Sequence, residues 1–414
     1  MEQFAACWEG LEDPRTGNAA LHDLHGLLMI ALCSVLCGGQ KATEMTEFAR
    51  AKEAFLRGFL KLAHGLPSHD TFSRLFRLLD PEKFGASFQR FMAAFGKRGK
   101  PRASSVVAAL VVTSGHATVV EFRHSGRLSA AMLHLRARGF APITAFGAQT
   151  RGVVAIDGKV VRRFHDKARG KSALHMVSAW GCEQRMVLAQ IATDAKSNEI
   201  TAIPKLLDML ALKGTIITTD ALNCQRTIAR KIVAQGGDYA LALKENQPSL
   251  HADGRLFLDD STHKPDDRHR SVDADHGRIE TRTASVSTDI AWLSAHQWPG
   301  LRAIGKVVRS RETGAKTTTE TAYYVLSTPL SAKRFNQVVR SHWGIENRLH
   351  WRLDVVMNED QARNRADNGP YNLAVLRHMA LNVMQKDATK GALRGKFKRA
   401  GWNEDYLTSL LALF

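Results

Sequence analysis

The sequence predicts an α/β protein whose centre is a mixed β-sheet with flanking helices. Two apolar, β-branched runs end on an aspartate, VVAID at residues 153–157 and TIITTD at residues 215–220. Farther along, residues 340–365 place acidic, basic and aromatic side chains at helical spacing. Buried strands that finish in a carboxylate place it at the carboxyl edge of the sheet, where open α/β sheets hold their sites.

The order of elements between residues 151 and 245 supports five strands. Strands are expected at residues 153–157, 171–180, 186–194, 215–220 and 238–244, with helices at 198–214 and 222–237. The turn GCEQR joins the second and third strands into an antiparallel hairpin. The helical crossovers require the last two strands to run parallel to the first.

The segment from residue 340 to residue 365 is expected to be a helix. Four polar residues on it recur every fourth position and share one face: His342, Glu346, His350 and Asp354. Leu349, Leu353 and Val356 form a neighbouring apolar stripe. Taken alone, the segment could equally be a solvated charged helix, and a single strand-end aspartate is more often a turn or helix cap.

The chain divides into four predicted regions. They are an N-terminal helical domain at 1–97, a linker or insertion of uncertain structure at 98–150, a catalytic domain at 151–385, and a basic tail at 386–414. Within the catalytic domain, residues 246–330 separate Asp220 from Glu346 and are expected to form a β-rich insertion that hangs over the site as a DNA clamp.

Composition favours a polyanionic partner. The 414 residues carry 58 Lys plus Arg against 40 Asp plus Glu, a net charge of +18. The same charge also fits a protein that is merely basic. Five cysteines without metal-ligand spacing indicate free thiols in a reducing cytoplasm. The apolar stretch at 27–37 is too short to span a bilayer, so no membrane association is expected.

A series of long motifs resembles bacterial insertion-sequence transposases of the Asp-Asp-Glu (DDE) type, in particular the H-repeat-associated family. The motifs are AIDGK, DAKSNEITAIPKLLDML, TTDALNCQ, GGDYALALKENQ, HGRIETR and RSHWGIENRLHWRLDVVMNEDQAR. The resemblance implies an RNase H-like core, two divalent ions (Mg²⁺ or Mn²⁺) and DNA cut-and-join chemistry. Carried over by motif, the catalytic and metal-binding acids are Asp157, Asp220 and Glu346. Asp157 is expected to bridge the ions.

Eight residues near these acids are expected to contact DNA. They are Lys159, Arg162, Arg163, Lys244, Arg340, His342, Asn347 and His350. The chain departs from related transposases, which carry an Arg four residues before the catalytic Glu, a Tyr seven before it and a Lys seven after it. Here those positions hold His342, Val339 and Leu353. His342 would replace the Arg as a phosphate ligand, while a zinc site on His342 and His350 is the less favoured alternative.

The resemblance implies a transposase that cleaves element ends and joins the 3′-hydroxyl to target DNA by a cut-and-paste route. Its partner would be double-stranded DNA, bound by a homodimer in the cytoplasm and associated with the nucleoid. Two alternatives remain: an RNase H-like nuclease without strand transfer, and an inactive or domesticated DNA-binding remnant. The intact acids argue against the remnant.

Overall fold

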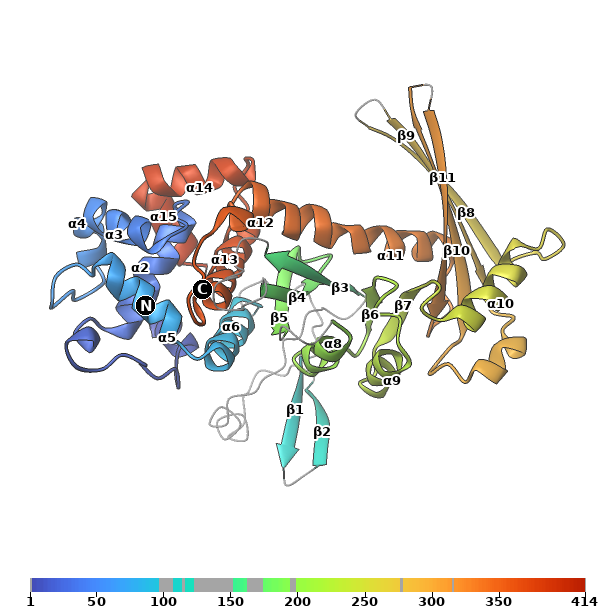
Figure 1. The fold of residues 1–414 in the computed structure, drawn as a ribbon, viewed down its shortest axis with the longest axis horizontal. Helices are drawn as coiled ribbons and strands as arrows, with labels where there is room; N and C mark the ends of the chain where they lie inside the picture. Colours follow the sequence, from blue (N-terminus) through green and yellow to red (C-terminus); the bar gives the residue numbers. More distant parts are fainter. Residues whose placement is uncertain are drawn as a thin grey trace.

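The protein is described here by a computed structural model covering residues 2–96, 107–113, 116–122, 152–161, 174–193, 199–275, 278–314 and 316–413. Figure 1 shows three parts in a row: a helical body, a central sheet and a strand-rich extension. None of the described helices combines the length and apolarity needed to cross a membrane.

Both ends of the chain build the helical body. Its N-terminal helices are α1 (Glu2–Cys7), α2 (Leu24–Leu36), α3 (Ala42–Ala51), α4 (Glu53–Arg57), α5 (His69–Leu78) and α6 (Pro81–Gly96). Two helix starts are capped as their sequences favour, since the Asp23 carboxylate accepts from Gly26 N at 2.7 Å and the Ser68 hydroxyl from Thr71 N at 3.3 Å. A short 3-10 turn, η1 (Gly17–Ala20), precedes α2.

The C-terminal helices complete the same body. They are α13 (Gly369–Lys386), α14 (Leu393–Trp402) and α15 (Glu404–Leu411). Helix α13 contacts α2, α5 and α6, and one hydrophobic cluster contains Leu28, Phe72, Met379 and Leu407. In the stretch expected as a basic tail, 386–414, the described residues form α14 and α15. Their Phe397, Ala400, Leu407 and Leu410 join this cluster, while Trp402 is 78% exposed.

The central sheet has nine strands in the order β5-β4-β3-β6-β7-β11-β10-β9-β8. Their bounds are β3 (Gly152–Val161), β4 (Leu174–Gly181), β5 (Met186–Thr193), β6 (Thr215–Thr219), β7 (Asp238–Leu243), β8 (Asp267–Asp275), β9 (Arg278–Ser287), β10 (Ala303–Thr313) and β11 (Lys316–Leu326). Strands β3, β6 and β7 are parallel, and β4, which is antiparallel to β3, forms an antiparallel hairpin with β5, as the sequence predicts.

Helices cover both faces of this sheet. On one face, α8 (Glu199–Asp208) and α9 (Arg226–Ala234) join a cluster that includes Val154 and Ile217. On the other, α11 (Ala332–Ile345) packs Phe335 and Val338 against Val153 and Ile216. Adjacent strand residues point to opposite faces, so a continuous β-branched run is buried on both sides.

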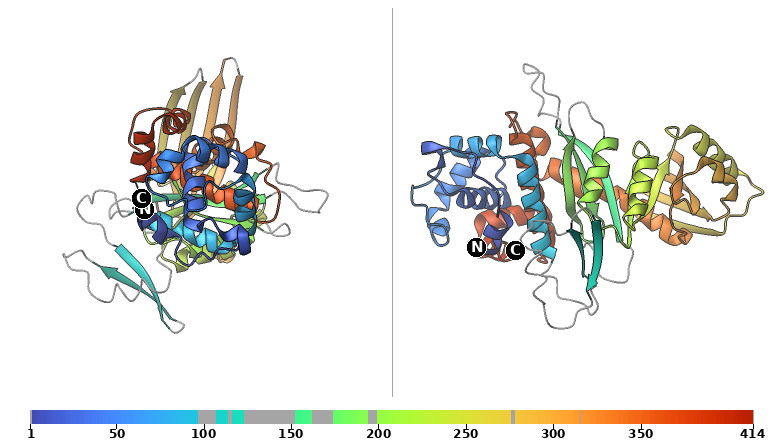
Figure 2. Two further views of the ribbon diagram at one scale, coloured as in Figure 1. Left: turned by 90° about the vertical axis from the view of Figure 1, so that its left-hand side faces the viewer. Right: turned by 90° about the horizontal axis from the view of Figure 1, so that it is seen from below.

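The five-stranded sheet expected from the sequence is too small. The insertion between β7 and α11 adds β8–β11, joined by α10 (Pro248–Asp259) and η5 (Ala291–His296). Strand β11 pairs antiparallel with β7, from Tyr323↔Leu243 to Leu326↔Ala240. The insertion therefore extends the sheet from its β7 edge rather than forming a separate layer, and the left view in Figure 2 shows its strands projecting beyond the rest of the molecule.

Residues 98–150 fall largely outside the described residues. Within them, β1 (Val107–Thr113) and β2 (His116–Phe122) pair antiparallel as a two-stranded sheet of their own. Among the described strands, β3 pairs with β4 and β6, so neither β1 nor β2 is a central strand beside residues 153–157. The division of the chain into domains remains a prediction.

Candidate catalytic carboxylate site

Asp157 lies where one side of strand β3 loses its partner. The parallel pairing of β3 with β6 ends at Ile156↔Thr219, whereas the antiparallel pairing with β4 continues to Val161. The prediction that the strand finishes at Asp157 is wrong in this detail. Only the pairing of β3 with β6 ends at this level. The Asp157 carboxylate therefore lies where β3 and β6 are no longer paired, and its side chain is 15% exposed.

Asp220 follows β6 directly. The register sets Ile156 beside Thr219, so Asp157 and Asp220 continue two adjacent strands at the same level. Neighbouring strands are separated by about 4.8 Å. Asp220 Oδ1 accepts hydrogen bonds from Asn223 Nδ2 at 2.8 Å and from Asn223 N at 3.3 Å. These bonds fix one oxygen of the carboxylate.

Glu346 begins a π-helical turn, which the regular four-residue spacing did not predict. Helix α11 passes into η6 (Glu346–His350) and then α12 (Trp351–Val355), and Trp351 N donates to Glu346 O. Such turns contain an extra residue and are frequent at functional sites. The Glu346 side chain is 51% exposed and faces the buried His350.

The structure brings Asp157, Glu346 and His350 together. One ligand atom from each lies within 4.8 Å of the other two. His350 Nδ1 is 3.6 Å from Asp157 Oδ2 and 3.5 Å from Glu346 Oε1. Two carboxylates and an imidazole converging from a strand and a helix form a donor set suited to a divalent cation.

The electrostatics of this group reflect crowded negative charge. Burial, followed by the charges of Glu346 and Glu199, raises the pKa of Asp157. The hydrogen bond with His350 is the main cause that lowers the pKa of Glu346. Burial and the Glu199 charge likewise raise the pKa of Asp220, against smaller lowering effects of Asn223 and Lys244. The metal-free site therefore favours protonation of both aspartates.

Sequence reasoning missed Glu199 and Asn223. Glu199 is the first residue of α8 and is 8% exposed, while Asn223 follows Asp220 by three residues and is fully buried. Asn223 Nδ2 donates to Glu199 Oε2 at 2.6 Å as well as to Asp220. Both residues lie within the family motifs, but a glutamate in the first turn of a helix is ordinary in sequence, and its tertiary contacts gave no local signal.

Lys159 does not occupy the predicted DNA-facing position. Its side chain is 9% exposed, and Nζ lies 2.7 Å from Asp354, 3.2 Å from Glu359 and 3.2 Å from Asp360. Because three carboxylates take up its charge in the interior, the ammonium is not available to a phosphate in this structure. Arg162 and Arg163 lie outside the described residues.

The two predicted histidine contacts are also engaged inside the protein. His350 is 5% exposed and belongs to the carboxylate group. His342 Nδ1 lies 3.0 Å from the Thr218 hydroxyl on β6. Burial is the main cause that lowers the pKa of His342 to about 4, so the ring is neutral at pH 7 and carries no charge for a phosphate. Among the described residues, His342 is not part of the group of possible metal ligands that contains His350.

The other predicted contacts lie at the surface. Lys244 is exposed just beyond β7, and its charge acts on Asp220. Asn347 is exposed beside Glu346. Arg340 is exposed on α11 and forms an ion pair with Asp273 of β8. Lys244 and Asn347 are therefore the predicted contacts that combine exposure with proximity to the carboxylates.

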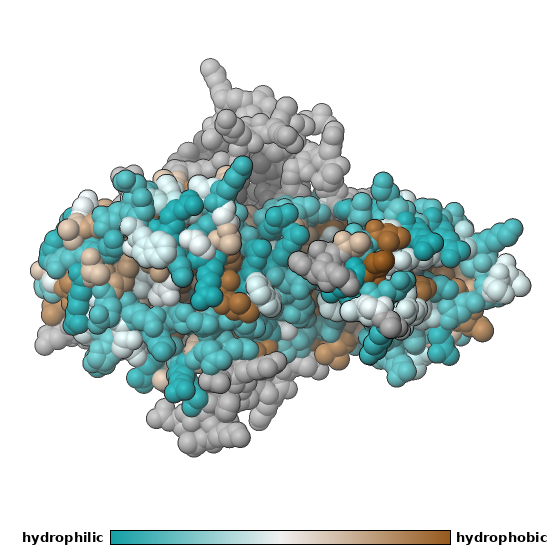
Figure 3. Space-filling model, turned by 90° about the horizontal axis from the view of Figure 1, so that it is seen from above, coloured by the Kyte–Doolittle hydropathy of each residue, from teal (hydrophilic) through white to brown (hydrophobic). Residues whose placement is uncertain are grey.

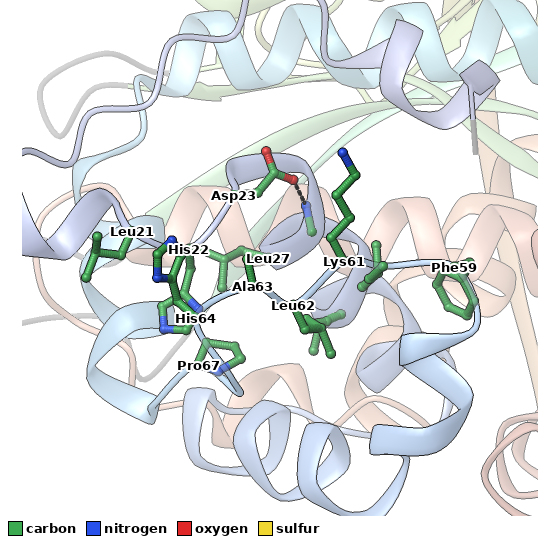
Figure 4. A pocket seen from close by; sticks show the side chains of 13 residues that line it. Leu21, His22, Asp23, Leu27, Phe59, Lys61, Leu62, Ala63, His64 and Pro67 are labelled. Carbon is green, nitrogen blue, oxygen red and sulfur yellow. Dashed lines mark hydrogen bonds between the residues drawn. The ribbon is translucent and has the colours of Figure 1, made fainter.

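A cavity of about 460 Å³ lies in the helical body, away from the carboxylates (Figure 4). Its wall joins the start of α2 to the loop after α4 and includes Leu27, Phe59, Leu62 and Pro67. His22 and His64 are its imidazoles, and the Asp23 carboxylate at its rim caps α2. It contains none of the predicted catalytic residues.

The fold and the carboxylates point to a nucleic-acid-processing class, and comparison with known proteins gives the family. Residues 148–383 match the family described as Transposase DDE domain, and residues 5–92 match its associated domain, DDE_Tnp_1-associated. The chain belongs to this DDE transposase family of insertion sequences.

Full-length relatives support this assignment. The chain is 33% identical to the "H repeat-associated putative transposase YhhI" of Escherichia coli K12, over 94% of this chain and 93% of YhhI. It is also 33% identical to the E. coli K12 "Putative protein YbfL", over 97% and 96% of the two chains. An uncharacterised Xanthobacter autotrophicus protein is 39% identical over 77% of this chain and 92% of its own length.

Among solved structures, a piggyBac transposase synaptic complex with hairpin DNA aligns with 99% of this chain and 77% of its own, at 10% identity and a TM-score of 0.39.

Proposed function

We propose that the protein is a metal-dependent DNA transposase that cleaves double-stranded DNA at the ends of its element and transfers the 3′-hydroxyl into target DNA. The main observation behind the proposal is that ligand atoms of Asp157, Glu346 and His350 lie within 4.8 Å of one another. Asp220 follows the strand next to that of Asp157, at the same level of the sheet. Family membership supports the general class of activity. The roles of these particular residues are our assignment.

The architecture around the acids supports an RNase H-like unit inside the larger sheet. Strands β5-β4-β3-β6-β7 have the order expected for that unit, with β3 at its centre and Asp157 on it. The two aspartates come from adjacent parallel strands and Glu346 comes from a helix after the insertion. This convergence lets three separate segments present carboxylates to one phosphodiester.

The donor set fits two hard divalent cations. Carboxylate oxygens are preferred by Mg²⁺ and Mn²⁺, and three crowded acids with raised aspartate pKa values gain from a nearby positive charge. Such ions, when bound, polarise the phosphate and make water a stronger nucleophile. Asp157, Asp220 and Glu346 would hold them, because Asp157 lies close to Glu346 and continues the strand next to the one that Asp220 follows.

The chain's own residues prepare this site. Asn223 fixes Asp220 Oδ1, which leaves Oδ2 without a hydrogen bond from the described residues and free to act as a ligand. His350 lies against Asp157 and Glu346 and limits their movement. Lys244 and Asn347, exposed nearby, are placed to bind the phosphates that flank the scissile bond.

The surface and charge agree with a polyanionic partner. The net charge is +18, and the face in Figure 3 is mostly hydrophilic, with hydrophobic residues in small separate groups. We propose that a homodimer binds the two element ends, in the cytoplasm and at the nucleoid. Phosphate neutralisation by lysine and arginine would supply most of the affinity.

The test separates chemistry from binding. Asp157→Asn and Glu346→Gln should each abolish Mg²⁺-dependent cutting of labelled double-stranded DNA carrying the element ends, while DNA affinity measured by fluorescence anisotropy in EDTA changes less than about threefold. Asp208→Asn, which removes an exposed acid paired with Lys231, is the control and should cut normally.

Two outcomes would redirect the assignment. Full cutting by either variant would remove that residue from the metal site. Cutting without any joined product, when a pre-cleaved 3′-hydroxyl end and target DNA are supplied, would favour the RNase H-like nuclease over the transposase.

A further inference from the structure

A chain of polar contacts runs behind the carboxylate site and ends on Asp220. His175 Nε2 on β4 lies 2.9 Å from Glu199 Oε1. The other oxygen, Glu199 Oε2, accepts from Asn223 Nδ2 at 2.6 Å, and the same nitrogen donates to Asp220 Oδ1 at 2.8 Å. Successive contacts therefore link four residues from β4, α8 and the loop after β6: His175, Glu199, Asn223 and Asp220.

Burial restricts the side chains in this series of contacts. Asn223 is fully buried and Glu199 is 8% exposed, so water has little access to either group. The two acceptors hold the Asn223 amide in one orientation, with Nδ2 between the carboxylates. Its Oδ1 has no hydrogen-bond partner among the described residues, so the orientation is set by the two acids alone. Removing one acceptor would release the amide.

Gly158 provides the space for this arrangement. A Cβ atom at that position would lie 2.2 Å from Glu199 Oε1 and 2.3 Å from His175 Nε2. Glycine is therefore required directly after Asp157 for Glu199 and His175 to meet there. The glycine of the AIDGK motif thus has a tertiary explanation, which ties the strand of the first aspartate to the support of the second.

We infer that Glu199 is a positioning residue: through Asn223 it fixes the orientation of Asp220 for divalent-ion binding. Groups that hold a ligand carboxylate act on metal affinity because they remove the cost of orienting it at the moment of binding. Glu199 does this through a hydrogen bond at 2.6 Å, so its acceptor atom and its reach matter more than its charge. This inference rests on the proposed metal site.

Two substitutions separate reach from charge. Glu199→Gln retains an oxygen acceptor at the same distance from the backbone and loses the charge. Glu199→Asp retains the charge but is one methylene too short to reach Asn223. Mn²⁺ binding to the full-length protein, measured by titration calorimetry and by the electron paramagnetic resonance of free Mn²⁺, should weaken about 10- to 100-fold in Glu199→Asp. It should stay within about threefold of the unmodified protein in Glu199→Gln.

A double-mutant cycle tests whether the effect passes through Asn223. Asn223→Ala should weaken Mn²⁺ binding as much as Glu199→Asp, and the double variant should be no weaker than Asn223→Ala alone. Glu183→Ala is the matched control, because Glu183 accepts from Val153 N at 2.9 Å at the other end of β3 and lies outside the series of contacts from His175 to Asp220. It should bind Mn²⁺ normally.

The outcomes distinguish the two proposals. If the unmodified protein shows no saturable Mn²⁺ binding, the metal site itself fails. If it binds Mn²⁺ but Glu199→Asp equals Glu183→Ala, the positioning role is overturned while the metal site stands. Additive losses in the double variant, or equal losses in Glu199→Gln and Glu199→Asp, would also overturn it. Thermal midpoints in EDTA identify any variant whose loss comes from unfolding.

Discussion

Lys159 Nζ lies 2.7 Å from Asp354 Oδ1 and joins two segments that carry proposed catalytic acids. Lys159 is two residues after Asp157 on β3, and Asp354 is eight residues after Glu346 on α12. Glu359 and Asp360 of η7 (Glu359–Gln361) complete the cluster, and Arg377 of α13 lies 3.8 Å from Glu359. The cluster therefore connects strand β3 to helices α12 and α13.

Replacing this lysine should destabilise the fold. Lys159→Met removes the cation that three partly or fully buried carboxylates share, which reduces the compensation of their negative charge in the interior. We expect a loss of about 3–5 kcal/mol in the free energy of unfolding, measured by denaturant titration. Lys231→Met, which removes a half-exposed partner of Asp208, is the control and should cost less than about 1 kcal/mol. Equal losses would contradict a buried structural role for Lys159.

Asp157 should make the metal-free protein less stable as pH rises. The pKa of Asp157 is raised in the folded state by burial, Glu346 and Glu199, whereas in the unfolded chain it is about 3.9. Between these two values the folded state binds more protons, so stability is present at low pH and is lost as pH rises through the folded pKa. In EDTA between pH 5 and 8, the unmodified protein should lose at least about 1.4 kcal/mol relative to Asp157→Asn.

The comparison of the unmodified protein with Asp157→Asn also tests the binding of divalent ions. Mg²⁺ or Mn²⁺ at about 100 times its dissociation constant should stabilise the unmodified protein by about 2.7 kcal/mol. Asp157→Asn should gain much less, although it starts more stable in EDTA at pH 8. Asp157 would not lie in a crowded metal site if the free energy of unfolding had the same pH dependence in both proteins, or if the ions stabilised both proteins equally.

Gly158→Ala should be costly for a steric reason. The new methyl would lie 2.2 Å from Glu199 Oε1 and 2.3 Å from His175 Nε2, and we expect a loss of about 1–3 kcal/mol in unfolding free energy. Gly395→Ala, in α14 with no atom within 4 Å of the added carbon, is the control and should be neutral or stabilising. A neutral Gly158→Ala would remove the reason for a glycine in that position.

DNA binding should depend steeply on salt. Each neutralised phosphate contributes about −0.9 to the slope of the logarithm of affinity against the logarithm of salt concentration. Lys244→Ala should reduce the magnitude of the slope by about 1 if Lys244 binds a phosphate beside Asp220, while Lys231→Ala should leave it unchanged. A flat salt response would point away from a polyanionic partner, despite the net charge of +18.

Much of the α/β core could be predicted because it is encoded locally. The β-branched runs of β3 and β6, the GCEQR turn and the amphipathic α8 and α9 each express a preference within a few residues, and their order restricts the pairing of the strands. The same runs placed Asp157 and Asp220 at one level of the sheet. The sequence also carried the motifs that place the chain in its family.

The remaining features depend on contacts between distant segments. The pairing of β11 with β7 gave a nine-stranded sheet, because an open strand edge accepts any strand that reaches it in register. Helices α14 and α15 joined the N-terminal body because their apolar faces required a partner that composition does not specify. Neither outcome has a local sequence signal.

At the site, the sequence alone identified Asp157, Asp220 and Glu346 as the acids to consider. Only the tertiary structure showed that Lys159 is buried among carboxylates, that a π-helical turn begins at Glu346, and that Glu199 supports Asp220 through Asn223. The physical reason is that the role of a charged side chain is set by burial and by partners that lie tens to hundreds of residues away in the chain. Residue type and spacing determine which groups are present, and packing determines what each of them faces.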